Sequence, residues 1–197
     1  LAGDGQGSFS YHGDFQVAPG VVALAADDMN RDGDTDLVFS NNLEDYVGTA
    51  LGDGEGLATE RRYPVGARPR MVVPGDFNKD GAEDLLVANL DSNDVTFLAG
   101  DGMGTFATGT SIPAGGSARA LATAHLNGDS NLDFVVTNLN ESRVAVFLGR
   151  GNGTFDAPSY VDVRDGSSTR SAEPRSLVLV DVSGDSHIDL IVGNANR

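Results

Sequence analysis

The chain has 197 residues, with 29 aspartates and glutamates against 13 lysines and arginines, for a formal net charge of −16. This acidity argues against nucleic-acid binding, which needs a positive surface that displaces counterions. A hydrophobic content of 40% is enough for one domain with a core, so the chain is not a disordered acidic tail. Cysteine is absent, which excludes disulfides and zinc–thiolate sites. No apolar run reaches the ~18 residues that a membrane span requires.

Aspartate dominates the acidic residues, with 23 of the 29. Aspartate is typical of turns and metal-binding loops, whereas glutamate is favoured on helical surfaces. No segment keeps a 3.6-residue apolar period for three turns, so the chain is expected to lack long helices.

Two motifs repeat in register along the chain. Four nine-residue segments align without gaps, and each precedes an apolar run that ends in asparagine. A glycine motif keeps a similar period and begins at Gly3, Gly52, Gly100 and Gly149. The last aspartate of each of the first three loops lies 16 residues before the next glycine motif. The aligned segments are DMNRDGDTD (28–36), DFNKDGAED (76–84), HLNGDSNLD (125–133) and DVSGDSHID (181–189).

Strand patterns surround each aspartate loop in the same order. One strand precedes the loop, a second follows it, a third ends at the glycine motif, and a short fourth segment comes after that motif. Four short strands repeated every ~49 residues predict the blades of a β-propeller. Nearly continuous apolar runs indicate sheets that neighbouring blades cover on both faces. The expected strands are 21–27, 37–41, 46–51 and 61–65; 70–76, 85–89 and 94–99; 119–125, 134–138, 143–148 and 158–163; and 175–181 and 190–194.

The predicted fold class is therefore all-β, a β-propeller region of about four four-stranded blades over residues 1–197. Three blades are complete and two half-blades lie at the ends. Either the ends close a small ring, or the chain is a section of a larger propeller; we favour the section, because a natural boundary rarely bisects a strand. The predicted units are 1–20 (partial), 21–69, 70–118, 119–174 and 175–197 (partial).

The aspartate loops have the composition of calcium sites. Oxygen-bearing side chains at positions 1, 3, 5 and 9, with a backbone carbonyl at position 7, suit an ion that binds six to eight hard oxygens. Position 12 lies in a strand and is not glutamate, which excludes an EF-hand. The alternative is that aspartate, asparagine and glycine merely form turns here. The predicted ligands are Asp28, Asn30, Asp32, Asp34 and Asp36; Asp76, Asn78, Asp80, Ala82 and Asp84; Asn127, Asp129, Asn131 and Asp133; and Asp181, Ser183, Asp185, His187 and Asp189.

The third loop differs because His125 occupies position 1, where a hard anion is wanted. Imidazole is a poor calcium ligand. We therefore expect the third loop to bind calcium most weakly.

The combination DxNxDGxxDL, LVxxN and GDGxGTF resembles the FG-GAP/VCBS repeat of integrin α-subunit-type β-propellers, and this resemblance covers the entire chain. It implies a calcium-binding propeller outside the cell that acts in adhesion or in ligand and carbohydrate recognition. The departures from the pattern are His125, Ser130, Ser186 and Ala58.

Three arginines, Arg70, Arg119 and Arg175, share one register six residues before their loops, where the first repeat has Val22. At the start of innermost strands, such arginines could line a central channel and bind an anion or an acidic sugar. The alternative is that each arginine pairs with nearby aspartates.

No nucleophile elbow, HExxH motif or phosphate loop occurs, so no catalytic residue is predicted. We expect a non-catalytic, secreted or cell-surface Ca²⁺ module that recognises a protein or glycan, does not bind nucleic acid and has no membrane span. Two alternatives stay open: the propeller portion of a lyase or hydrolase, and a structural subunit of an extracellular assembly or filament that self-associates through terminal half-blades.

Overall fold

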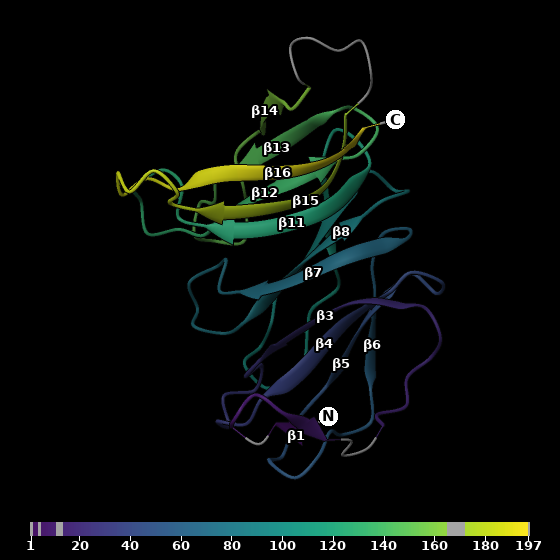
Figure 1. Ribbon diagram of the computed structural model, residues 1–197. Helices are drawn as coiled ribbons and strands as arrows, with labels where there is room; N and C mark the ends of the chain where they lie inside the picture. Colours follow the sequence, from purple (N-terminus) through teal and green to yellow (C-terminus); the bar gives the residue numbers. More distant parts are fainter. Residues whose placement is uncertain (1, 4, 11–13, 165–171, 197) are drawn as a thin grey trace.

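The computed structural model describes residues 2–3, 5–10, 14–164 and 172–196, and these residues form strands and turns (Figure 1). Three four-stranded antiparallel sheets are meanders whose strands pair in chain order. No helix in the described ranges is long and apolar enough to cross a membrane.

The first blade contains β3 (Val21–Asp27), β4 (Asp36–Asn41), β5 (Tyr46–Ala50) and β6 (Arg61–Pro64). The second contains β7 (Pro69–Gly75), β8 (Asp84–Asn89), β9 (Asp94–Leu98) and β10 (Thr110–Pro113). The third contains β11 (Ala118–Ala124), β12 (Asp133–Asn138), β13 (Arg143–Phe147) and β14 (Ser159–Asp162).

Two further two-stranded sheets lie toward the ends of the chain. They are β1 (Ala2–Gly3) with β2 (Phe9–Ser10), and β15 (Ala172–Val180) with β16 (Asp189–Asn196). In Figure 1 the first strands of successive sheets, β3, β7, β11 and β15, follow one another, and each contacts the next. We call these four the inner strands. The all-β, blade-by-blade architecture predicted from the repeat is confirmed.

Most strand positions agree with the sequence pattern. The strand β3 occupies the predicted residues 21–27, and β7 and β11 begin one residue before the predicted starts. The strand β15 begins at Ala172, earlier than the predicted residue 175. The bounds of β10 were not predicted, because its sequence TSIP has one large apolar residue, Ile112, and no apolar run.

The core lies between neighbouring blades. All residues of β8 and β12 are buried, as expected for second strands covered on both faces. One apolar cluster joins the first and second blades and another joins the second and third. In the latter, Phe155 of the fourth glycine motif packs edge-on against Phe134 with ring centroids 4.7 Å apart, and against Phe77 and Phe97 of the preceding blade.

The glycine motifs form the predicted turns between third and fourth strands. Gly104 and Gly153 both have a φ of 74°, a conformation that glycine adopts without steric cost. A Cβ atom at Gly104 would lie 2.6 Å from Leu51 Cδ2, and one at Gly153 would lie 2.9 Å from Phe97 Cε1. Glycine therefore lets each turn lie directly on the preceding blade.

Phe106 and Phe9 end equivalent glycine motifs but have different surroundings, which gives a matched test of interblade packing. Phe106 is 6% exposed and packs edge-on against Tyr63 with ring centroids 5.3 Å apart, whereas Phe9 is 72% exposed. We expect Phe106→Ala to lower the free energy of unfolding by about 3–4 kcal/mol and Phe9→Ala to lower it by less than about 1 kcal/mol. Urea denaturation of both variants measures the difference. Equal losses would contradict the interblade role of Phe106.

Candidate metal loops and an arginine-lined cavity

Each aspartate loop connects an inner strand to the second strand of its sheet, so the loops recur at the same place in every blade. Position 4 has a left-handed backbone in all four loops, with φ from 61° to 78° at Arg31, Lys79, Gly128 and Gly184. Position 6 is also left-handed at Gly33, Gly81 and Ser186. These turns curl the loops and direct alternate side chains inward. Glycine at position 6 of the first two loops suits this backbone, whereas Arg31 and Lys79 at position 4 give no sequence signal for it.

The oxygens at positions 1, 3 and 5 accept hydrogen bonds from their own loop. In the first loop Asp28 Oδ2 accepts the N–H of Gly33 at 2.9 Å, and Asn30 Oδ1 accepts the N–H of Asp32 at 3.1 Å. Asp32 Oδ1 in turn accepts the N–H of Asp34 at 2.8 Å. The loop conformation is therefore stabilised by side chain to backbone bonds that are independent of a bound ion.

The aspartate at position 9 has a different role. Asp36, Asp84 and Asp133 are at most 1% exposed, and each accepts one N–H with each carboxylate oxygen. One N–H comes from position 2 of the same loop. The other comes from the first glycine of the next glycine motif, at 2.7 Å for Gly52, 2.9 Å for Gly100 and 2.8 Å for Gly149. This bond is the physical reason for the constant 16-residue spacing.

The fourth loop makes only part of this arrangement. Asp189 accepts the N–H groups of Val182 at 3.0 Å and Ser183 at 3.1 Å, both with Oδ2. The loop is also more exposed than the others, and its position 2 residue Val182 is 64% exposed.

The second loop has the donor chemistry of a cation site. Asp76 Oδ1 is buried and has no hydrogen-bond partner among the described residues. Burial is the largest cause that raises the pKa of Asp84 to about 6; the nearby charges of Asp80 and Asp76 raise it further, while the N–H groups of Gly100 and Phe77 lower it. A cation beside these carboxylates would neutralise them and supply the missing partner.

The described residues nevertheless contain no group of three histidine, aspartate or glutamate side chains placed to hold a metal. A calcium ion in the second loop would therefore also need non-acidic donors, such as Asn78 and the carbonyl of Ala82. The predicted ligand sets stay predictions.

In the third loop a histidine lies where the sequence predicted a weak site. His125 Nδ1 is 2.7 Å from the carbonyl oxygen of Asn131, the position 7 oxygen expected to bind calcium. A carbonyl only accepts hydrogen bonds, so Nδ1 carries the hydrogen and donates it. Lys79 Nζ also donates to Ser130 Oγ at 2.7 Å, which brings a positive charge from the second loop to the third. Both contacts favour weak metal binding here.

The basic residues at position 4 extend to the next blade. A Cβ atom at Gly81 would lie 3.2 Å from Arg31 Nη2, and one at Gly102 would lie 3.0 Å from Arg31 Cζ. Lys79 reaches the third blade in the same way. These contacts were not predicted from the sequence; the available signal was a basic residue at position 4 of two adjacent loops.

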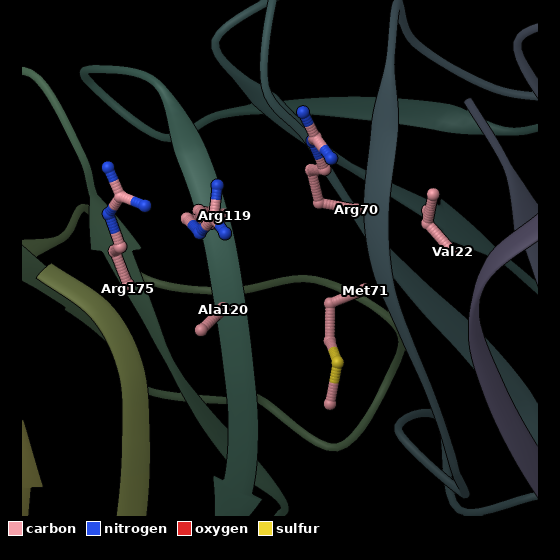
Figure 2. Close-up of a pocket in the computed structure, with 6 residues that line it drawn as sticks. All are labelled: Val22, Arg70, Met71, Arg119, Ala120 and Arg175. Atoms are coloured by element: carbon pink, nitrogen blue, oxygen red, sulfur yellow. The ribbon is translucent and has the colours of Figure 1, made fainter. Parts of the chain in front are cut away.

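The three arginines in register line one cavity of about 170 Å³, together with Val22, Met71 and Ala120. Figure 2 shows their side chains extending from neighbouring inner strands toward the same side of the view. The antiparallel register shifts between Val21 and Ala23, Pro69 and Met71, Ala118 and Leu121, and Pro174 and Ser176. Val22, Arg70, Arg119 and Arg175 thus lie at bulges, which redirect side chains locally.

The arginines do not pair with the loop aspartates. Arg70 lies six residues before Asp76 on an extended strand, about 20 Å away at ~3.3 Å per residue. Arg175 pairs with Glu173 at 2.7 Å. Within the described part of the chain, neither Arg70 nor Arg119 has a carboxylate within 4.0 Å, and Arg70 Nε is buried without an acceptor. Burial lowers the pKa of Arg70, and the charges of Arg68 and Arg119 lower it further, against the opposing effect of Asp91.

The family model of the FG-GAP-like repeat matches this chain three times in succession, at residues 28–87, 76–136 and 125–192. These matches overlap and cover most of the chain. No curated protein sequence matches significantly.

Solved structures with a similar fold include the pore of the Photorhabdus luminescens Tc holotoxin, at 21% identity and a TM-score of 0.52 over 88% of this chain and 8% of that one. A BBS1N structure in complex with ARL6DN has 12% identity and a TM-score of 0.60, covering 90% of this chain and 52% of its own. An Agrocybe aegerita lectin described as recognising non-reducing terminal N-acetylglucosamine has 18% identity and a TM-score of 0.57, over 85% and 45% of the two chains. The chain spans about half the length of these proteins or less.

The hydrogen bond between the aspartate at position 9 and the glycine N–H 16 residues later can be tested with a matched pair of aspartates. In Asp133→Asn one carboxylate oxygen becomes an NH₂ group, so the buried N–H of Leu126 or Gly149 loses its acceptor. We expect a loss of about 1–3 kcal/mol in the free energy of unfolding. In Asp189→Asn a single oxygen can keep both N–H groups, so the expected loss is smaller. Denaturant unfolding in chelator measures both variants, and a larger loss for Asp189→Asn would refute this role of position 9.

Proposed function

Because the chain belongs to the FG-GAP-like repeat family, we propose that it is an extracellular, calcium-stabilised propeller module that recognises a protein or glycan ligand and carries out no catalysis. The observation that carries the calcium part is the second loop, where a buried oxygen of Asp76 lacks a partner and the pKa of Asp84 is raised.

Calcium binding would offset the electrostatic cost of the acidic loops. Twelve of the 23 aspartates lie in the four nine-residue loops of a chain with a net charge of −16. Carboxylates within ~4–6 Å of one another disfavour their ionised forms. An ion that binds only the folded chain contributes about 2.7 kcal/mol per site at a hundredfold excess over its Kd. That is a large part of the ~5–15 kcal/mol stability of an ordinary domain.

The proposed extracellular location is supported by the modest calcium affinity that these loops favour. Their side chains already bond to backbone N–H groups, which compete with the ion, and the third and fourth loops are largely exposed. Extracellular calcium modules work with dissociation constants of ~10⁻⁴–10⁻³ M. Sites of modest affinity are filled only where calcium is that abundant.

Recognition without catalysis is supported by the surroundings of the histidines. His125 donates to a backbone carbonyl, and His187 lies 3.3 Å from Asp185 within its own loop. Both therefore belong to the loops and not to a nucleophile–base pair. The lectin among the similar structures favours a glycan as the ligand class.

Thermal unfolding tests the calcium part. We expect the melting temperature to fall in chelator and to rise on return of calcium by roughly 5–10 °C per filled site. Magnesium should restore little of this loss, because it demands a smaller octahedral shell and gives up water reluctantly.

The matched variants for this experiment are Asp80→Asn and Asp129→Asn. Both residues occupy position 5 and make equivalent bonds to position 7 N–H groups and position 3 amides. The first variant should reduce the gain in melting temperature with calcium, whereas the second should leave it nearly unchanged because His125 occupies the third loop. A melting temperature that does not respond to chelator would mean that the loops are turns only.

Ligand screening tests the recognition part. The chain, labelled and applied to an array of neutral and acidic glycans in millimolar calcium, is expected to bind a subset of them. Because calcium would stabilise the folded chain, this binding should weaken in chelator. Binding to no glycan, with a hydrolysis or elimination product formed from any of them, would favour the enzyme alternative and contradict this function.

A further inference from the structure

We propose that the arginine-lined cavity binds the oxyanion of an acidic sugar, a carboxylate or sulfate group, between the guanidinium groups of Arg70, Arg119 and Arg175. This inference rests on the proposed function and deepens it, because it assigns a ligand class and a site to glycan recognition.

The first support is convergence. The three side chains come from three successive inner strands, β7, β11 and β15, and line a single cavity (Figure 2). Each arginine lies at a break in the strand register, where a bulge changes the direction of the side chain. The same break occurs at Val22 in the first blade, which completes the lining with an apolar residue. The repeat therefore brings three positive charges together from positions about 50 residues apart.

The second support is that two of these charges lack a protein counter-ion. Arg70 and Arg119 have no carboxylate within 4.0 Å in the described ranges, although acidic residues outnumber basic ones 29 to 13. Arg70 is partly desolvated, its Nε has no acceptor, and Arg68 and Arg119 repel its charge. An oxyanion in the cavity would accept from these guanidinium groups and relieve the repulsion, since planar guanidinium donors match carboxylate and sulfate oxygens.

The third support is the size and lining of the cavity. A volume of about 170 Å³ is room for roughly six water molecules at ~30 Å³ each. That space admits one acidic group or one sugar ring and excludes a folded protein surface. Met71 and Ala120 add apolar contact beside the arginines, which suits the carbon face of a sugar ring.

Titration calorimetry in calcium buffer tests this assignment with four probes: glucuronate, glucose 6-sulfate, inorganic sulfate and glucose. We expect either acidic sugar to bind more tightly than inorganic sulfate, and glucose to give no signal. Combined replacement Arg70→Gln, Arg119→Gln and Arg175→Gln should weaken acidic-sugar binding at least tenfold, because charge-assisted hydrogen bonds are lost. The melting temperature should stay the same or rise as the mutual repulsion is removed.

The matched control removes an equal number of arginine charges outside the cavity. It combines Arg61→Gln, Arg150→Gln and Arg164→Gln, and none of these residues lines the cavity. It should bind acidic sugars as the unaltered chain does. If the triple cavity variant does not fold, Arg119→Gln alone serves, with an expected loss of about tenfold.

Three results would overturn the assignment: no binding of either acidic sugar, binding of inorganic sulfate as tight as that of the sugars, or an equal loss in the control variant. Retained calcium-dependent binding to neutral glycans alongside any of these would defeat the cavity site and leave the proposed function standing. Loss of all glycan binding together with an unchanged melting temperature in chelator would defeat the proposed function itself.

Discussion

A buried aspartate carboxylate at the ninth loop position holds each complete repeat together. In Asp36, Asp84 and Asp133 one oxygen accepts the N–H at position 2, and the other accepts a glycine N–H 16 residues further along the chain. The carboxylate thereby joins the loop between the first two strands to the turn that follows the third. An unsatisfied buried donor costs ~1–3 kcal/mol. Because both oxygens are used, an asparagine at this position would leave one of the two N–H groups without an acceptor.

The position of the glycine turn then determines how neighbouring blades pack. Once its first glycine is fixed, the turn lies on the preceding blade, and the N–H of Gly153 donates to the carbonyl of Phe77 at 3.1 Å. The phenylalanine that ends the motif then enters the interblade core, as Phe106 and Phe155 do. Stacking in this way brings the inner strands side by side, so residues in equal register come together. Arg70 and Arg119 come side by side in this way, on inner strands that contact each other, although they lie about 20 Å from the loops.

Much of this architecture was predictable from the sequence, because the same strand and turn patterns recur in each repeat. The strands β3, β4 and β5 were located by apolar runs, and the glycine turns by their spacing. The common register of Arg70, Arg119 and Arg175 followed from alignment alone. The alignment could not show that these arginines do not pair with the loop aspartates, because ion pairing depends on distances along a strand and across blades. The two roles of aspartate in one loop were also hidden: Asp36 and Asp32 are the same residue type, yet one is buried against two N–H groups and the other is exposed. Likewise, the left-handed backbone at Arg31 and Lys79 carries no sequence signal, because neither residue favours it.

Amide hydrogen exchange measured by NMR tests the role of the ninth-position carboxylate most directly. The amides of Gly52, Gly100 and Gly149, bonded to buried carboxylates, should exchange only when the whole chain unfolds, even in chelator. The amides of Asp32, Asp80 and Asp129, bonded to side chains on exposed parts of the loops, should exchange faster by local opening. Exchange of the three glycine amides as fast as that of the loop aspartates would contradict the account.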